Sequence, residues 1–173
     1  MDADLGRSFL DCSANSLDQL SGRIAACLPK LTYDQLWARG TENENAAGNL
    51  VLHLCGNLRQ WIGTGVGGKP DVRNRDAEFA ARGEFQPVEL GTRLKEAVEE
   101  ALSTIRSLPS ERLLKSVTIQ GYQVTLLEAI YHVVEHFAQH TGQIIFATKL
   151  LTGEDLGFYK RLRRPGAHTE KTP

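Results

Sequence analysis

Four of the five histidines lie in two segments with helical periodicity, and their spacing suits metal binding. His132, His136 and His140 follow one another at intervals of four residues, while His53 lies in a separate segment. Residues four apart on a helix project to one side, so such a pair can direct two imidazole nitrogens at one ion. A third imidazole from another helix would leave a position open for water or substrate. The histidines therefore predict a mononuclear metal site.

A helical wheel indicates which two of the three neighbouring histidines are ligands. At about 100° per residue, His136 and His140 border the apolar stripe of their helix, whereas His132 lies toward the polar side. Ala129 and Ala147 flank the pair and leave room for an ion. We therefore expect His136 and His140 to bind the metal, with His132 near the rim of the pocket.

His53 is the expected third ligand because it lies on the inner side of its own helix. The inner stripe of that helix includes Leu50 and Leu54, with Asn57 and Gln60 close to the same direction. An imidazole that faces inward without a partner loses free energy, so it needs hydrogen bonds or an ion. His53, His136 and His140 form the predicted metal site.

Several polar residues near the predicted ligands are candidates for catalysis, although no catalytic residue is assigned. Glu135, His132 and Gln60 could orient a ligand or move a proton, and Asn57 and Gln143 could support them. An ordinary polar contact is an equally simple role for each of them alone.

Two further residues lie close to His53 in the sequence. Arg59 could hold a substrate carboxylate or form an exposed ion pair. Cys55 should point across the helix from His53 and is a poor candidate ligand.

Three alternatives compete with this site. The stretch from His132 to His136 reads H-x-x-E-H, the inverted zincin motif, in which Glu135 would be the general base. That motif needs an acidic ligand on a following helix, and only Glu154, Asp155 and Glu170 follow residue 151. The histidines could also be ordinary polar residues of a metal-free interaction module, or the ion could serve structure alone.

Four segments with helical periodicity must position these residues. They cover residues 4–28, 45–64, 87–107 and 125–151. Thr125 and Glu128 form a capping box at the start of the last segment, and Gly153 provides its end. The order of elements predicts an all-α, up-and-down four-helix bundle.

The connections between these helices differ in length. Thr32 and Gln35 form a capping box for a short helical turn, and residues 117–124 alternate as in a small hairpin or a simple turn. Residues 63–86 are rich in glycine and charge, which predicts a long loop that covers the pocket or is disordered. Residues 1–155 are expected to form one domain, and 156–173 a partly irregular C-terminal extension.

Composition limits the classes of partner. Among 173 residues, 20 basic side chains balance 21 acidic ones, so no overall charge favours nucleic acid or a membrane surface. The three cysteines are odd in number, which favours a reducing compartment, and the first residues resemble no signal peptide. We expect a cytoplasmic protein that acts on a small molecule.

Two segments together resemble the DinB-like superfamily of bacterial four-helix bundles. They are NLVLHLCGNLRQW around His53 and VVEHFAQHTGQIIFATKLL around His136 and His140, and the likeness extends loosely over residues 5–152. The resemblance implies one divalent cation, such as zinc, nickel or iron, on these three histidines. It also implies a homodimer, and a second apolar stripe on the last helix agrees with an additional packing partner.

The activities known in that superfamily differ, so the resemblance implies more than one function. They include bacillithiol- and mycothiol-dependent S-transferases, relatives of maleylpyruvate isomerase and metal-dependent hydrolases. The expected function is a metal-dependent S-transferase or hydrolase, with a low-molecular-weight thiol as one substrate class. The alternative is a non-catalytic bundle that binds a metal or another ligand.

Overall fold

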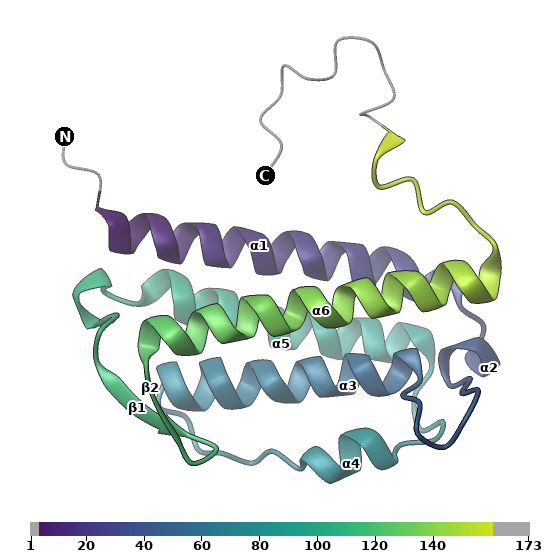
Figure 1. Cartoon of the computed structure of the whole chain (residues 1–173), viewed down its shortest axis with the longest axis horizontal. Helices are drawn as coiled ribbons and strands as arrows, with labels where there is room; N and C mark the ends of the chain where they lie inside the picture. Colours follow the sequence, from purple (N-terminus) through teal and green to yellow (C-terminus); the bar gives the residue numbers. More distant parts are fainter. Residues whose placement is uncertain (1–3, 161–173) are drawn as a thin grey trace.

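Four long helices run side by side and make up most of the chain (Figure 1). The computed structural model describes residues 4–160. The long helices are α1 (Leu5–Cys27), α3 (Ala47–Leu58), α5 (Pro87–Ser107) and α6 (Leu126–Thr152). Helix α1 packs against α5 and α6, and α3 packs against the same two helices. The protein is thus mostly helical, as the sequence predicts.

Shorter elements connect the long helices. They are η1 (Leu28–Lys30), α2 (Tyr33–Leu36), the π-helix η2 (Arg59–Val66), α4 (Arg75–Ala80), η3 (Ser110–Arg112), β1 (Ser116–Ile119) and β2 (Tyr122–Thr125). The two strands pair antiparallel, with Ser116 opposite Thr125. Gln120 and Gly121 form the turn with φ of 53° and 82°, the left-handed conformation that tight hairpin turns require. The residues expected to form a hairpin or a turn therefore form a hairpin.

The ends of the helices follow from capping chemistry. Thr125 Oγ1 accepts a hydrogen bond from the Glu128 N–H, and the Glu128 carboxylate accepts one from the Thr125 N–H. Gly153 ends α6 with a φ of 71°. Helix α3 begins one residue later than Asn45 predicts, because the Asn49 side chain accepts from the Ala46 N–H and makes Ala46 the N-cap.

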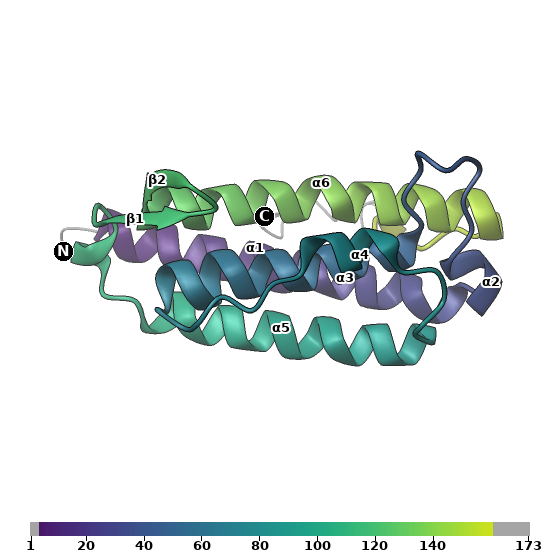
Figure 2. The same ribbon diagram turned by 90° about the horizontal axis from the view of Figure 1, so that it is seen from below.

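The segment expected to be one long loop is partly helical. The π-helix η2 continues α3 as far as Val66, and α4 lies within the expected loop, where the Asn74 side chain caps it by accepting from the Ala77 N–H. Helix α4 packs along α3, as seen from below in Figure 2. The segment thus packs against the bundle despite its many charges, and Glu78 is buried as the partner of Arg73.

The core lies between the four long helices and is apolar. Leu54, Leu94 and Phe137 are almost fully buried in it. Val88 fits the apolar periodicity of α5 but is 75% exposed. Among residues 4–160, no helix is both long and apolar enough to cross a bilayer. The expected C-terminal extension lies outside the described residues from 161 onward.

Candidate metal centre

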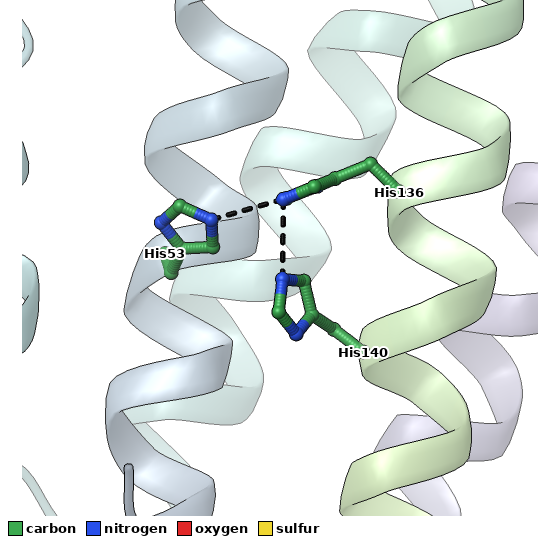
Figure 3. Close-up of side chains that lie close together, drawn as sticks. All are labelled: His53, His136 and His140. Atoms are coloured by element: carbon green, nitrogen blue, oxygen red, sulfur yellow. Dashed lines mark hydrogen bonds between the residues drawn. The ribbon is translucent and has the colours of Figure 1, made fainter. Parts of the chain in front are cut away.

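The three predicted ligands meet between α3 and α6. Figure 3 shows His53 reaching from α3 toward His136 and His140 on α6. The Nε2 atom of His136 lies 3.0 Å from Nε2 of His53 and 3.1 Å from Nε2 of His140. One nitrogen from each ring lies within 4.8 Å of the other two. Three imidazole nitrogens therefore converge on one point.

The separations suit a single ion. Two nitrogens bound to Zn²⁺ at about 2.1 Å lie roughly 3.0 Å apart when their angle at the ion is 90°, and roughly 3.4 Å apart in a tetrahedral site. The measured 3.0 and 3.1 Å fall at the lower end of this range. The third pair of nitrogens, from His53 and His140, lies within 4.8 Å, so all three nitrogens border the space that one ion would fill.

Hydrogen bonds at the far side of two rings fix their tautomers. His53 Nδ1 lies 3.0 Å from the Glu78 carboxylate, and His140 Nδ1 lies 2.6 Å from the Gln143 side-chain oxygen. Each acceptor favours a proton on Nδ1, which leaves the lone pair on Nε2. In both residues, the nitrogen that faces His136 is thus the one that can bind a metal.

Hydrogen bonding alone leaves this arrangement incomplete. A single proton on His136 Nε2 can make only one good hydrogen bond, although two lone pairs face it. With the proton on Nδ1 instead, three lone pairs converge, and Nδ1 is buried with no partner among residues 4–160. A cation at the point of convergence satisfies all three Nε2 atoms together, so the residues present fit a metal ion.

Glu78 is held in place by an arginine. Arg73 donates from Nε to one Glu78 oxygen and from Nη2 to the other, both at 2.8 Å. Arg73 Nη2 also lies 3.1 Å from His53 Nδ1. A guanidinium only donates and a carboxylate only accepts, so Arg73 Nη2 and His53 Nδ1 both donate to the same Glu78 oxygen. The acidic and basic charges thus cancel behind His53.

Burial and neighbouring charges set the protonation of the site. Burial lowers the pKa of His136 to about 3, with help from the positive charge that His140 and His53 would carry. Burial likewise lowers the pKa of His140, against its hydrogen bond to the Gln143 side-chain oxygen, which raises it. For Glu78, burial raises the pKa, but the hydrogen bonds from Arg73 and His53 outweigh it and the pKa is lowered. Neutral imidazoles beside an ionised carboxylate are the forms that a metal site requires.

The candidate catalytic residues lie outside this cluster. His132 stacks on Trp61 with ring centroids 4.1 Å apart, one turn from His136. Glu135 is exposed, and no hydrogen bond or ion pair holds it among residues 4–160. Gln60 accepts a hydrogen bond from Arg73 Nη1 at 2.9 Å and another from Gln120. The inverted zincin arrangement, with His132 as a ligand and Glu135 as the base, is not what the structure assembles.

The remaining candidates near His53 occupy different surroundings. Arg59 is exposed, whereas Asn57 is buried. Cys55 is also buried, and burial raises the pKa of its thiol to about 12, so it is neither a thiolate nor a ligand. Gln143 alone among the supporting candidates contacts a ligand directly.

The sequence pattern does not identify Glu78 and Arg73, which contact His53 Nδ1 directly. Both lie in the segment expected to be a loop, and the usable signal was Asn74, an N-cap residue ahead of a short run that can form a helix. That signal predicts α4, but it does not identify which acidic residue of α4 turns inward.

A cavity of about 510 Å³ adjoins two of the three clustered histidines, His53 and His136, and also His132. Helices α3 and α6 form two of its sides, with His53 and His136 among its lining residues. Tyr122 and Val124 from the hairpin form another side. The volume lies within the range of small-molecule sites, so a ligand can reach the histidines from solvent.

Comparison with known proteins identifies a family and a fold. A crystal structure titled as the conserved protein of a locus from Enterococcus faecalis superposes with a TM-score of 0.69 and 16% sequence identity, over 83% of this chain and 97% of the other. At that identity the likeness shows the fold alone. No curated protein matches the sequence. The sequence model of DUF1572, described as a protein of unknown function, matches residues 4–162. Because that match covers most of its length, the chain belongs to the family DUF1572.

Proposed function

We propose that this protein is a metal-dependent enzyme built on a four-helix bundle of the DinB-like type. His53, His136 and His140 would hold one divalent ion, such as zinc, nickel or iron. The observation that carries the proposal is the convergence of three Nε2 atoms, two of which lie 3.0 and 3.1 Å from the third. Imidazole ligands suit these metals about equally, so the ligand set does not choose among them.

The neighbouring residues would prepare the ligands. Glu78 holds His53 in the tautomer that offers Nε2, and Gln143 does the same for His140. Arg73 neutralises Glu78, so the carboxylate does not become a competing ligand. A bound ion would supply a Lewis acid, able to lower the pKa of a water molecule or to hold a thiol as its thiolate.

The reaction that fits such a site is hydrolysis or transfer of a thiol. Both need an open coordination position and access for a small molecule, and the 510 Å³ cavity supports that access. The thiol would come from the substrate, because Cys27 and Cys55 are buried, with the pKa of Cys55 raised to about 12, and the exposed Cys12 does not line the cavity. A low-molecular-weight thiol therefore remains the substrate class to test first.

One observation favours a non-catalytic role instead. A hydrolase needs a general base beside the ion, yet the Glu78 carboxylate is already bound by Arg73 and His53. Glu135 is exposed and outside the cluster. A bundle that only binds an ion or a ligand is thus the second candidate, and it predicts metal binding without turnover.

Homodimerisation is also part of the proposal. Helix α6 carries exposed Tyr131 and Phe146, with the small Ala138 between them. An exposed apolar stripe of this kind suits a second copy of the chain. Multi-angle light scattering of the wild type and of Ala138→Glu tests it, and a monomeric wild type would contradict it.

Metal content provides the first test of the site. The protein is purified without chelator, and bound elements are measured by mass spectrometry in the wild type, His136→Ala and His132→Ala. We expect about one divalent ion per chain in the wild type and in His132→Ala, and almost none in His136→Ala. His132 is the matched control, because it lies one turn away on the same helix and outside the cluster. A metal-free wild type that also fails to bind added zinc, nickel or iron would refute the proposal.

Activity then separates the two candidates. The loaded protein is incubated with thiols plus an electrophile and, separately, with amide and ester substrates. Turnover that disappears in His136→Ala supports the enzyme. Metal binding with no turnover across both sets supports the binding protein.

A further inference from the structure

Beyond the histidines, the cavity holds a buried amide that has no structural partner. Asn57 lies one helical turn after His53, is 4% exposed and lines the 510 Å³ cavity. Among residues 4–160, no hydrogen bond to its side chain is found. The amide keeps some accessible surface, so its hydrogen-bonding groups face the cavity, where a ligand can reach them.

Trp61 lies one turn farther along the same face, is 5% exposed, lines the same cavity and stacks on His132. Its indole Nε1 is enclosed and has no acceptor among the described residues, so a ligand would meet the ring and not the N–H. Beside the histidines, Asn57 is therefore the polar group on this helix face that a ligand in the cavity can reach.

The charges around the cavity favour an anion. Glu78 is balanced by Arg73, while Arg75 lines the cavity and has no ion pair among residues 4–160, only a contact with the Phe79 ring at 4.9 Å. Glu128 also lines the cavity, and hydrogen bonds from Thr125 lower the pKa of its carboxyl, so its negative charge offsets the positive charge of Arg75. Three neutral imidazoles would leave the charge of a bound dication uncompensated.

We infer that this cavity binds a small organic anion that also carries an amide or carbonyl group. Its anionic end lies at the histidines and Arg75, and its amide or carbonyl hydrogen-bonds Asn57. Tyr122 and Val124 of the hairpin cover the apolar part of the molecule. The inference rests on the proposed function, because the bound ion supplies part of the positive charge. Asn57 thus determines which anions the site selects.

Two probes that differ only in the amide test this selectivity. N-acetylglycine and pentanoate have similar length and the same carboxylate, but pentanoate has no amide. We expect the zinc-loaded full chain to bind N-acetylglycine about five- to tenfold more tightly in calorimetry, as one neutral hydrogen bond provides. Asn57→Leu and Asn57→Ala should remove this difference, and the exposed control Asn15→Ala should keep it. No binding of either probe, or an unchanged preference in both Asn57 variants, would overturn the inference.

A stability measurement tests the same residue without any ligand. If Asn57 serves a ligand alone, replacing its unpaired amide by the apolar Leu leaves the free energy of unfolding equal to or above that of the wild type. A clearly less stable Asn57→Leu would show that the amide supports the fold and would contradict the inference.

Zinc content, measured on each sample, separates this inference from the proposed function. Loss of zinc from the wild type counts against the metal site. Retained zinc without selectivity for N-acetylglycine counts against the cavity.

Discussion

Helices α5 and α6 both run the length of the molecule, but they use their buried sides differently (Figure 1). Every buried residue of α5 is apolar: Leu90, Leu94, Ala97, Val98, Ala101, Leu102 and Ile105. Helix α6 buries Phe137 and Ile144 on one side and keeps three histidines half-buried beside them. Helix α5 therefore buries apolar side chains alone, whereas α6 divides its inner surface between apolar packing and the histidines.

The buried polar groups of α6 differ in whether they have hydrogen-bond partners. Thr141 donates to the Phe137 carbonyl at 2.7 Å, and Thr148 donates to the Ile144 carbonyl at 2.8 Å, so both buried hydroxyls are satisfied within the helix. His136 Nδ1, by contrast, has no partner among residues 4–160. The one buried side-chain atom of α6 that lacks a partner among residues 4–160 thus belongs to a histidine that meets α3, and local rules of polar satisfaction are most often broken at functional sites.

The largest expected effect comes from a core residue of α5. Leu94→Ala should lower the free energy of unfolding by about 3 kcal/mol, because Leu94 is almost fully buried and the change leaves a cavity. His136→Leu should lower it by no more than about 1 kcal/mol in metal-free protein, since an apolar side chain replaces a poorly satisfied one. Chemical denaturation of both variants without metal measures the difference.

Zinc affinity should show the reverse order. Folded Leu94→Ala should bind zinc as the wild type does, and His136→Leu should not bind it. If His136→Leu destabilised the metal-free protein as much as Leu94→Ala, the division between the two helices would be wrong.

The second prediction concerns the partner of His53 that α4 supplies. Glu78→Gln should weaken zinc binding by roughly 10- to 100-fold, because a neutral amide orients the imidazole less firmly and makes it a weaker donor. Asp76→Asn is the matched control, as it removes a carboxylate from the exposed side of the same short helix. Competition with a chromophoric chelator measures both affinities. Equal affinities for the two variants would show that the Glu78 contact does not support the metal site.

The sequence predicts the long helices and the cluster because periodicity reports which face of a helix is buried. His136 and His140 border the apolar stripe of a helix with a clear capping box, and His53 lies on the inner stripe of another. Because the inner faces of the two helices pack together, the imidazole rings on those faces must lie close to one another. The hairpin was predicted only as one of two possibilities, since a four-residue strand carries too short a pattern.

What the sequence does not predict depends on contacts between distant polar residues. Glu78 and Arg73 bury their charges only because each neutralises the other beside His53, and no local pattern reveals such a pair. Val88, in the first turn of α5, fits the periodicity of the helix and yet is exposed, although Leu90 two residues later is fully buried. The periodicity of a sequence therefore predicts which face of a helix is buried, but it does not predict which charged residues pair in the folded chain.

The third prediction uses pH to measure how the buried His136 of α6 affects the free energy of unfolding. Because burial lowers the pKa of His136 from 6.5 to about 3, the unfolded chain binds a proton below pH 6.5 that the folded chain does not bind. The stability of the metal-free protein is therefore fully present above about pH 7 and declines as the pH falls toward 3. Between pH 7 and pH 5 we expect a loss of about 1–2 kcal/mol from this residue.

Urea denaturation of the metal-free wild type and His136→Leu at pH 7 and pH 5 isolates this contribution. The wild type should lose more stability than the variant over this interval, and the difference between the two losses belongs to His136. Burial also lowers the pKa of His140 and His132, so the variant should retain a smaller dependence of the same sign. Carboxylates such as Glu78, whose pKa is lowered, titrate below this interval and do not obscure it. Equal losses in the two proteins would mean that His136 is as well solvated in the folded chain as in the unfolded one, and the contrast between α5 and α6 would then not extend to proton binding.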